Sequence, residues 1–372
     1  MLNTTRTPRR GALARSESRQ ALGFVTPALV GLALFTFVPV ALSIVMGFFD
    51  WPPFGEKTFV GFDNYVKLFT DSPDFWPALR NTFVFALLYV PISVALSYLL
   101  ALSLHSRIRG RGALRVLFFI PVVTPMVANV LVWKMMLQPQ GLFNGISQSW
   151  FGIQLPNFLA DPQWAMIMVV AMSVWQGVGY NMLIFSAALE QLPESIVEAA
   201  RIDGATGITM LWKITVPLTS PSIFFASIMT MISSMQVFVQ PQMLTGGGPG
   251  NATLPIVQFI YNQGFKFQEL GLAAAAAWIL FAIIIAPGVL AELDTAGEPK
   301  PPRRMRERKL NAEMARPTAP LSRGERVRLV FAHIWIYLAA ALFMAPLVYA
   351  FFSALKPNQE IFAMPPSLFA SE

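Results

Sequence analysis

The chain of 372 residues contains no cysteine and two histidines, and charged residues make up 13% of it. The absence of cysteine excludes disulfide scaffolds and cysteine-ligated zinc or iron–sulfur sites. The histidines, His105 and His333, are too far apart in sequence to indicate a metal cluster, so we expect no metal site and no cofactor. An ordinary soluble domain carries roughly 25% charged residues. With 55% hydrophobic residues, the composition predicts a protein that crosses a membrane several times.

Seven windows without Asp, Glu, Lys or Arg are long enough to cross a bilayer as helices, which takes about 20 residues. The first is too long for a cleavable signal peptide and no small-residue cleavage site follows it. The fold class expected is therefore an all-α, polytopic membrane protein. The windows are Gln20–Phe49, Asn81–Ser106, Val116–Trp133, 162–189, Ser222–Leu244, Leu270–Ala291 and Leu329–Leu355.

Positive charge marks the segments that we expect in the cytoplasm. Ten of the 27 Lys and Arg residues fall between Lys300 and Arg328, five lie between Arg6 and Arg19, and the link Arg107–Arg115 has four arginines. The segment Leu137–Gln163 has no lysine or arginine. The positive-inside rule therefore predicts a cytoplasmic N-terminal tail (1–20) and a cytoplasmic basic linker (292–328).

The segment Glu190–Pro221 falls on the cytoplasmic side by alternation, although it is not basic. Pro193 and Glu194 favour a helix start, and Ser195–Ile202 continues it. Asp203-Gly204 predicts a turn, because glycine accepts a positive φ. A second short helix, Thr206–Ile214, would expose Met210, Leu211 and Trp212. Such a hairpin is either a docking site for a partner or an amphipathic segment on lipid headgroups.

A spaced motif favours docking. The loop reads Glu198-Ala199-Ala200, then Asp203-Gly204-Ala205, then Ile214, Pro217 and Pro221. This order resembles the EAA loop of ATP-binding-cassette importer permeases, with Leu211 where phenylalanine is usual. Further similarity to the carbohydrate-uptake branch, the maltose and glycerol-phosphate type, extends over roughly Gln20–Ala286. It rests on Trp175, Gly179-Tyr180-Asn181-Met182, Leu189–Pro193 and Thr245–Thr253.

The resemblance implies a six-helix permease domain at 21–291, in which the loop 190–221 is the coupling helix. That helix would sit in a cleft of a separate ATPase, with Met210–Trp212 as anchor and Glu198 holding the geometry of the loop. This chain has no G-x-x-x-x-G-K-[ST] loop, and the glycine run Gly246–Gly250 lacks the lysine. The implied partners are two ATPase subunits, a second permease subunit and an extracytoplasmic solute-binding protein. The protein would then be a transport subunit of a bacterial inner membrane, in contact with lipid, neither an enzyme nor a nucleic-acid binder.

The C-terminal part exceeds one such permease. Arg323–Glu372 resembles the start of a second, maltose-type partner permease, with Ser353–Pro357 after its span and Met314 as a reasonable start. We therefore expect residues 329–372 to carry one additional transmembrane helix and to end before a second EAA loop. The chain is then a fragment of a fused permease or a read-through product.

Polar side chains within the spans are candidates for the solute path, because a polar solute needs hydrogen-bonding groups. They could equally bond between helices. Alignment with the maltose-type subunit implies a path through Ser173, Gln176, Gly177, Tyr180, Ser233, Ser234 and Val237, and Asn181 and Gln236 are further candidates. Val122 and Met126 stand where that relative has polar residues, which weakens maltose as the solute. Lys134, at a span end, is expected to snorkel to the outer surface. Scarce cations favour a neutral sugar or polyol over an anion.

Three other functions compete. An ion-coupled carrier would need an Asp or Glu inside the membrane, and the seven windows have none. A membrane enzyme would need a constellation of carboxylates, histidines or a metal near the interface. A non-functional, truncated permease fusion serving as an anchor is the third.

Overall fold

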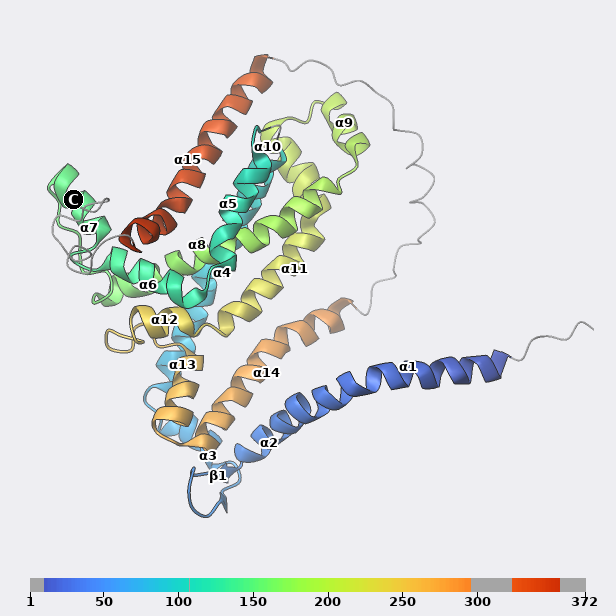
Figure 1. Ribbon diagram of the computed structural model, residues 1–372, viewed down its shortest axis with the longest axis vertical. Helices are drawn as coiled ribbons and strands as arrows, with labels where there is room; N and C mark the ends of the chain where they lie inside the picture. The colour runs from blue at the N-terminus through green and yellow to red at the C-terminus, as the bar shows by residue number, and fades with distance from the viewer. Residues whose placement is uncertain (1–9, 107, 296–322, 355–372) are drawn as a thin grey trace, which may run out of the picture. The chain divides into compact units, whose positions relative to one another are not determined.

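The computed structural model describes the backbone of residues 10–106, 108–295 and 323–354 (Figure 1). Side chains are described for residues 21–106, 108–286 and 330–354. The predictions made for the first nine residues, for Met314 and most of the basic linker, and for the end of the chain from Leu355 lie outside these residues.

The all-α prediction is confirmed. The described chain is helical apart from loops and one two-stranded antiparallel ladder, in which β1 (Phe49–Asp50) pairs with β2 (Thr58–Phe59). Three helices contain or adjoin π-helical segments, η1 (Ala33–Phe37), η2 (Leu211–Thr215) and η3 (Asn262–Lys266). The α-helices are α1 (Arg10–Leu32), α2 (Val38–Met46), α3 (Asp63–Thr70), α4 (Phe75–His105), α5 (Arg111–Val123), α6 (Met126–Leu137), α7 (Leu142–Phe151), α8 (Pro162–Glu190), α9 (Glu194–Ile202), α10 (Gly207–Met210), α11 (Val216–Met235), α12 (Val239–Leu244), α13 (Ile256–Tyr261), α14 (Leu270–Thr295) and α15 (Arg323–Ala354).

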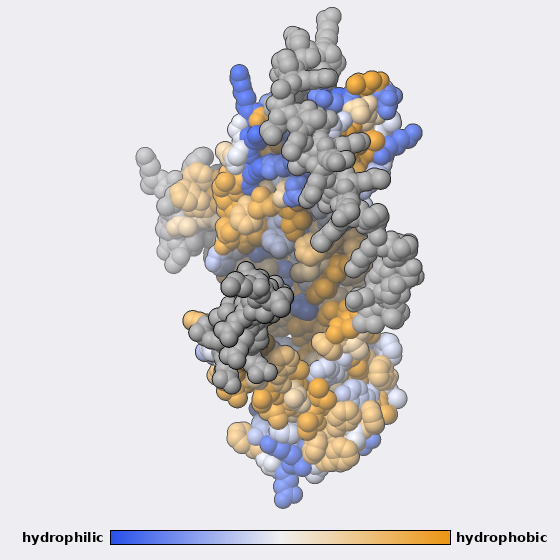
Figure 2. Space-filling view, turned by 90° about the vertical axis from the view of Figure 1, so that its right-hand side faces the viewer, coloured by the Kyte–Doolittle hydropathy of each residue, from blue (hydrophilic) through white to orange (hydrophobic). Residues whose placement is uncertain are grey.

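Five helices of the described chain are long and apolar enough to cross a membrane. They are Ala21–Met46, Phe75–His105, Pro162–Glu190, Gly207–Met235 and Val330–Ala354, and Leu270–Ala286 is a shorter apolar helix. Hydrophobic side chains cover much of the face seen in Figure 2, as expected where a surface meets lipid rather than water. The windows found in the sequence thus correspond to helices, with two corrections given below.

The chain divides into two compact units, of which the smaller contains residues 1–71 and 260–279. Asn64 of α3 ties the start of this unit together, because its Nδ2 donates to the carbonyl oxygens of Gly47 (3.1 Å) and Phe49 (2.9 Å). Lys67 forms an ion pair with Glu269 at 3.2 Å. None of the residues in the most apolar part of Ala21–Met46 is buried, so its whole surface suits lipid or a partner helix.

The larger unit contains residues 72–259 and 280–372. Its core lies where α4 packs against α8, with α5 and α11 beside them (Figure 1). Gly179 allows α5 and α8 to approach closely, because a Cβ at this position would overlap the carbonyl oxygen of Phe118. Between α4 and α8, the Ser97 hydroxyl donates to the carbonyl of Val178 at 2.9 Å.

The third predicted span is wrong as a continuous helix. It is broken between α5 and α6, and α5 meets the following stretch Met126–Phe151, which comprises α6 and α7, at an angle of 95°. Pro125 pushes the preceding Thr124 into an extended conformation (φ −74°, ψ 137°) and has no N–H to donate to the Pro121 carbonyl. The buried Asn129 supplies the missing donor, since its Nδ2 lies 2.9 Å from that oxygen. The fifth predicted span is displaced: α11 begins at Val216 and ends at Met235, and α12 is a separate short helix.

The C-terminal span, α15, packs within the larger unit against α4, α5 and α6. Phe343 lies against Phe118 and Trp175, with ring centroids 5.0 Å and 5.8 Å away. The Trp175 Nε1 donates to the backbone carbonyl of Phe343 at 2.7 Å. Pro346 interrupts the hydrogen-bond ladder of α15 close by, where it leaves the Leu342 carbonyl without a backbone donor. Near the other end, the Tyr337 hydroxyl donates to the carbonyl of Arg109 at 2.7 Å.

Candidate functional site

The loop between α8 and α11 folds into the predicted helix and turn. Helix α9 ends in a Schellman motif, in which the Ala205 N–H donates to the Ala200 carbonyl (2.8 Å) and the Gly204 N–H to the Arg201 carbonyl (3.1 Å). Gly204 has φ +81°, which a side chain would resist. The spaced residues Ala200, Asp203, Gly204 and Ala205 therefore share a local function, the reversal of the chain after α9.

The second predicted helix is shorter than expected and runs without interruption into the span. Helix α10 comprises Gly207–Met210, and η2 joins it directly to α11. Pro217 falls in the first turn of α11 and Pro221 inside it, so neither proline separates the loop from the membrane helix. A displacement of the loop is therefore carried straight into α11.

The exposed apolar groups of this loop differ from those predicted. Leu211 packs against the buried cluster around Phe185, and Met210 is half-buried. Trp212 is exposed as expected, at 64%. Two isoleucines that the sequence analysis missed are more exposed, Ile202 at 87% and Ile208 at 76%. We call Ile202, Ile208 and Trp212 the elbow surface; the signal that could have revealed it was the pair of isoleucines flanking Gly204.

Glu198 and Ala199 are exposed on α9, whereas Ala200 is buried and Ile214 is half-buried. Within the described part of the chain, the Glu198 carboxylate makes no side-chain hydrogen bond or ion pair. Backbone bonds of the Schellman motif fix the turn in the described structure, and the geometric role expected of Glu198 stays a prediction. Its carboxylate is left available to a partner.

An ion pair joins the start of the loop to α5. Arg115 and Glu190 approach to 2.6 Å, with side chains 25% and 53% exposed. At this exposure the pair contributes about 0–1 kcal/mol to stability. Its consequence is geometric: the last residue of α8 is linked to the first turns of α5, beside the predicted cytoplasmic loop.

Three of the predicted path residues donate hydrogen bonds within or between helices. Ser173 and Ser234 are buried and donate to carbonyls of their own helices, those of Val169 and Met231, each at 2.7 Å. Asn181 of α8 donates to the Thr230 hydroxyl of α11 at 2.9 Å. For these three residues the geometry is that of helix packing.

Other predicted path residues keep unused polar groups. The Gln176 side chain is 7% exposed and its carboxamide oxygen is buried without a hydrogen-bond partner in the described structure. Tyr180 is 53% exposed, and Ser233 and Gln236 are also exposed. A Cβ on Gly177 would overlap the Tyr89 hydroxyl. The apolar members remain packed or half-buried: Val122, Met126 and Val237.

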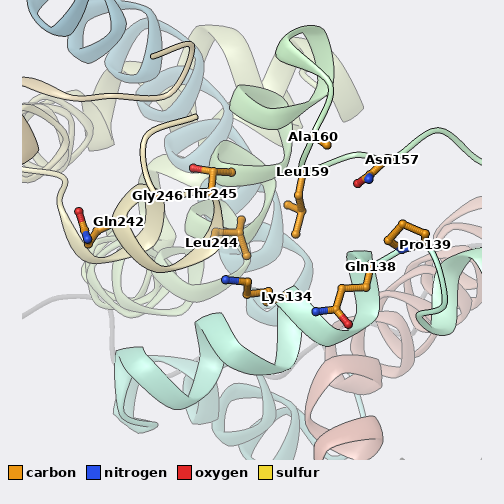
Figure 3. A pocket seen from close by; sticks show the side chains of 10 residues that line it. All are labelled: Lys134, Gln138, Pro139, Asn157, Leu159, Ala160, Gln242, Leu244, Thr245 and Gly246. Carbon is orange, nitrogen blue, oxygen red and sulfur yellow. The ribbon is translucent and has the colours of Figure 1, made fainter. Parts of the chain in front are cut away.

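Lys134 differs from the expectation that it snorkels to the surface. Its Nζ donates to the backbone carbonyl of Met243 at 3.0 Å, across to α12. The side chain borders a pocket of about 460 Å³, formed by the end of α6, the chain before α8, and α12 with the residues after it (Figure 3). We call this the α6–α12 pocket. Its lining is Lys134, Gln138, Pro139, Asn157, Leu159, Ala160, Gln242, Leu244, Thr245 and Gly246.

The glycine-rich loop after α12 is fixed by α4. Asn81, which is buried, donates to the carbonyls of Asn251 (2.7 Å) and Leu254 (3.1 Å). The Thr82 hydroxyl accepts from the Ile256 N–H at 2.8 Å. Among the described residues, no group of three or more His, Cys, Asp or Glu could hold a metal ion.

Comparison with known proteins identifies the family. Residues 93–293 match the family described as "Binding-protein-dependent transport system inner membrane component". The probable ABC transporter permease protein YurN of Bacillus subtilis is 36% identical over 268 residues, which cover 71% of this chain and 91% of that protein. The lactose transport system permease protein LacF of Rhizobium radiobacter is 33% identical, over 77% of this chain and 96% of its own. The sn-glycerol-3-phosphate permease UgpA of Agrobacterium fabrum is 35% identical, over 70% and 89%.

A solved structure has the same fold. One chain in the crystal structure of a bacterial alginate ABC transporter, in complex with an alginate pentasaccharide-bound periplasmic protein, aligns with a TM-score of 0.67 at 21% identity. The alignment covers 77% of this chain and 97% of that one. The family match, the relatives and the helices that can span a membrane agree, and the chain belongs to the inner-membrane permease components of binding-protein-dependent ATP-binding-cassette transport systems.

Proposed function

We propose that this permease moves a sugar, polyol or sugar-phosphate-like solute into the cytoplasm, driven by a separate ATPase that engages the loop around Glu198–Gly204. The observation that carries the proposal is the elbow surface. Three large apolar side chains, Ile202, Ile208 and Trp212, are exposed on a backbone reversal that continues directly into α11. Exposed apolar groups beside an unpaired carboxylate are suited to docking against a protein cleft.

The proposal includes an orientation and a set of partners. The N-terminus, the link around Arg109 and the elbow lie in the cytoplasm, as the arginine distribution favours. Two ATPase subunits, a second permease and an extracytoplasmic solute-binding protein complete the importer. The solved alginate transporter, which is in complex with a periplasmic protein, supports the last partner. The similarity to the lactose permease LacF and the sn-glycerol-3-phosphate permease UgpA supports the class of solute.

Cross-linking tests the docking step. The chain has no cysteine, so Ala205→Cys places a unique thiol on the elbow. In membranes that contain the complete transporter, a short thiol–lysine cross-linker should join this position to a nucleotide-hydrolysing subunit. Gln154→Cys, an exposed position before α8, should give no such product. Capture of the ATPase from residue 154 and not from residue 205 would show that the elbow faces the other side, and the proposal would fail.

A pair of glutamates on α9 tests the role of the carboxylate. Glu198→Ala should uncouple solute-stimulated ATP hydrolysis, because it removes the exposed charge next to the elbow surface. Glu194→Ala removes an exposed charge from the first turn of the same helix and should cost only about 0.3–1 kcal/mol of helix stability. Equal activity of the two variants in the reconstituted complex would refute an ATPase contact at Glu198.

We also propose that α15 is the first span of a second permease joined to this one. The family match ends at residue 293, before α15, and the basic linker separates the two. A chain ending after residue 322 should still transport solute when an intact second permease is supplied. Loss of a stable protein in that truncation would instead make α15 part of this permease's own fold.

A further inference from the structure

We propose that the α6–α12 pocket is an outer solute subsite, which binds one sugar unit of a neutral carbohydrate before it enters the membrane path. The inference rests on the proposed function, which it deepens by naming where the solute first contacts this subunit. With a volume of about 460 Å³, the pocket is within the roughly 300–1,000 Å³ usual for small-molecule sites.

The lining provides the groups that a hydroxyl-rich molecule needs. Gln138 and Asn157 each carry a carboxamide, which offers a donor and an acceptor side by side and so matches the two oxygens of a vicinal diol. Apolar surface from Pro139, Leu159 and Leu244 is available to the C–H groups of the ring. In Figure 3, Gln138, Asn157 and Leu159 lie around one space together with Lys134 and Leu244, whereas the Gln242 carboxamide points away from it.

Charge favours a neutral sugar over an anion. Lys134 is the single cation among the described residues that line the pocket, and one of its three donors is used by the Met243 carbonyl. The two donors left can bond hydroxyl oxygens. Recognition of a phosphate or carboxylate typically uses a bidentate arginine or several charges, which this lining lacks.

The pocket is both accessible and firmly built. Asn157, Ala160 and Gly246 are exposed, so the lining can be reached from solvent. Thr245 donates to the Pro241 carbonyl (2.9 Å) and pairs with Thr253 (2.7 Å), which fixes one wall without needing a ligand. Leu244 belongs to the same buried cluster as Trp175 and Val237, so the pocket adjoins the packed face of α8. The elbow joins the end of α8 to the start of α11, so the other ends of these two helices, and the pocket beside them, are extracytoplasmic in the proposed orientation.

A unique thiol tests the subsite on the full chain purified alone. Ala160→Cys places the thiol in the lining, and its modification by a small water-soluble reagent is followed with and without 100 mM lactose. Lactose should slow the reaction at least threefold, and Lys134→Gln or Gln138→Ala should remove the protection. Gln154→Cys, an exposed position outside the lining, should react equally fast in both conditions. Glycine betaine at equal osmolality controls for crowding.

The outcomes separate the subsite from the transport function. Protection by sn-glycerol 3-phosphate but not by lactose would overturn the neutral-sugar assignment in favour of an anion site. Protection by neither, in a chain whose complete transporter still imports solute, would overturn the subsite and leave the proposed function standing. In that transporter, Lys134→Gln should raise the KM for uptake several-fold and change kcat little. If Lys134→Gln abolishes the protection by lactose but leaves the KM for uptake unchanged, the pocket is not a step on the import path.

Discussion

Two tryptophans in one aromatic cluster provide a matched test of how α15 is held. Trp133 and Trp175 have ring centroids 5.8 Å apart and are 9% and 7% exposed. The Trp175 Nε1 donates to the Phe343 carbonyl of α15, whereas the Trp133 Nε1 is buried and has no partner in the described structure. Substitution of either residue by phenylalanine removes the same atoms from a similarly packed site, so that the difference between the two variants isolates the hydrogen bond.

The difference in stability between the two variants follows from what each indole N–H does in the native protein. Trp175→Phe should lose a hydrogen bond worth about 1 kcal/mol, or nearer 0.6 kcal/mol within a membrane. Trp133→Phe should instead remove an unsatisfied donor, whose burial costs about 1–3 kcal/mol in the native protein. Both lose comparable packing. The free energy of unfolding should therefore be lower for Trp175→Phe than for Trp133→Phe, by about 2–4 kcal/mol.

The assay is equilibrium unfolding of the two purified variants in one detergent, with the parent chain alongside. We expect Trp133→Phe to lie near the parent and Trp175→Phe to be clearly less stable. A chain that ends before α15 should abolish the gap, since the acceptor is then absent. If both variants lose the same stability while α15 is present, the hydrogen bond from Trp175 to Phe343 does not stabilise the packing of α15, and the reasoning is wrong.

Three further predictions concern the elbow, the helix core and the outer loop. Gly204→Ala should destabilise the elbow by about 1 kcal/mol, and the cause is the positive φ alone, because a Cβ at this position meets nothing within 4 Å. Asparagine tolerates a positive φ, so Gly204→Asn should retain more solute-stimulated ATP hydrolysis than Gly204→Ala. Equal activities of the two variants would contradict this. Gly179→Ala should lower the free energy of unfolding by about 1–3 kcal/mol, because the added Cβ pushes α5 away from α8. Gly112→Ala on α5 is the control: it has open space around the Cβ and should be neutral or slightly stabilising, and thermal unfolding in detergent compares the two. Asn81→Leu should leave the Asn251 and Leu254 carbonyls without their donor and accelerate amide hydrogen exchange in residues 245–256, an effect that unchanged exchange would exclude.

Local chemistry explains which features the sequence could predict. The helix from Glu194 and the turn at Gly204 depend on prolines and glycines within a few residues, and these predictions are confirmed. Hydropathy likewise predicted helices at the windows, except for the break in the third and the displacement of the fifth. The break at Thr124 was missed because a search for uncharged windows ignores the backbone, although Pro121 and Pro125 were visible in the sequence.

Tertiary contacts explain what could not be predicted. Whether Leu211 or Ile208 faces solvent depends on where α10 meets the cluster around Phe185, which no local pattern encodes. The acceptor of Trp175 is 168 residues away. The sequence likewise predicts that Lys134 reaches the outer surface, because its hydrogen-bond acceptor, the Met243 carbonyl, belongs to a helix more than 100 residues later in the chain. The path residues Ser173, Gln176 and Tyr180 remain predictions.

The bond from Asn129 to the Pro121 carbonyl has a wider consequence. Where a proline deprives an oxygen of its donor within hydrocarbon, an amide must be kept nearby whatever the cargo, since an unmet carbonyl there costs several kcal/mol. The polar side chain of Asn129 is thus explained by the backbone carbonyl that it satisfies, and it is not evidence of a contact with the solute. Because Asn129 belongs to α6 and Pro121 to α5, the same bond spans the break and holds the angle between the two helices, so that a change of this angle would first have to release the carbonyl.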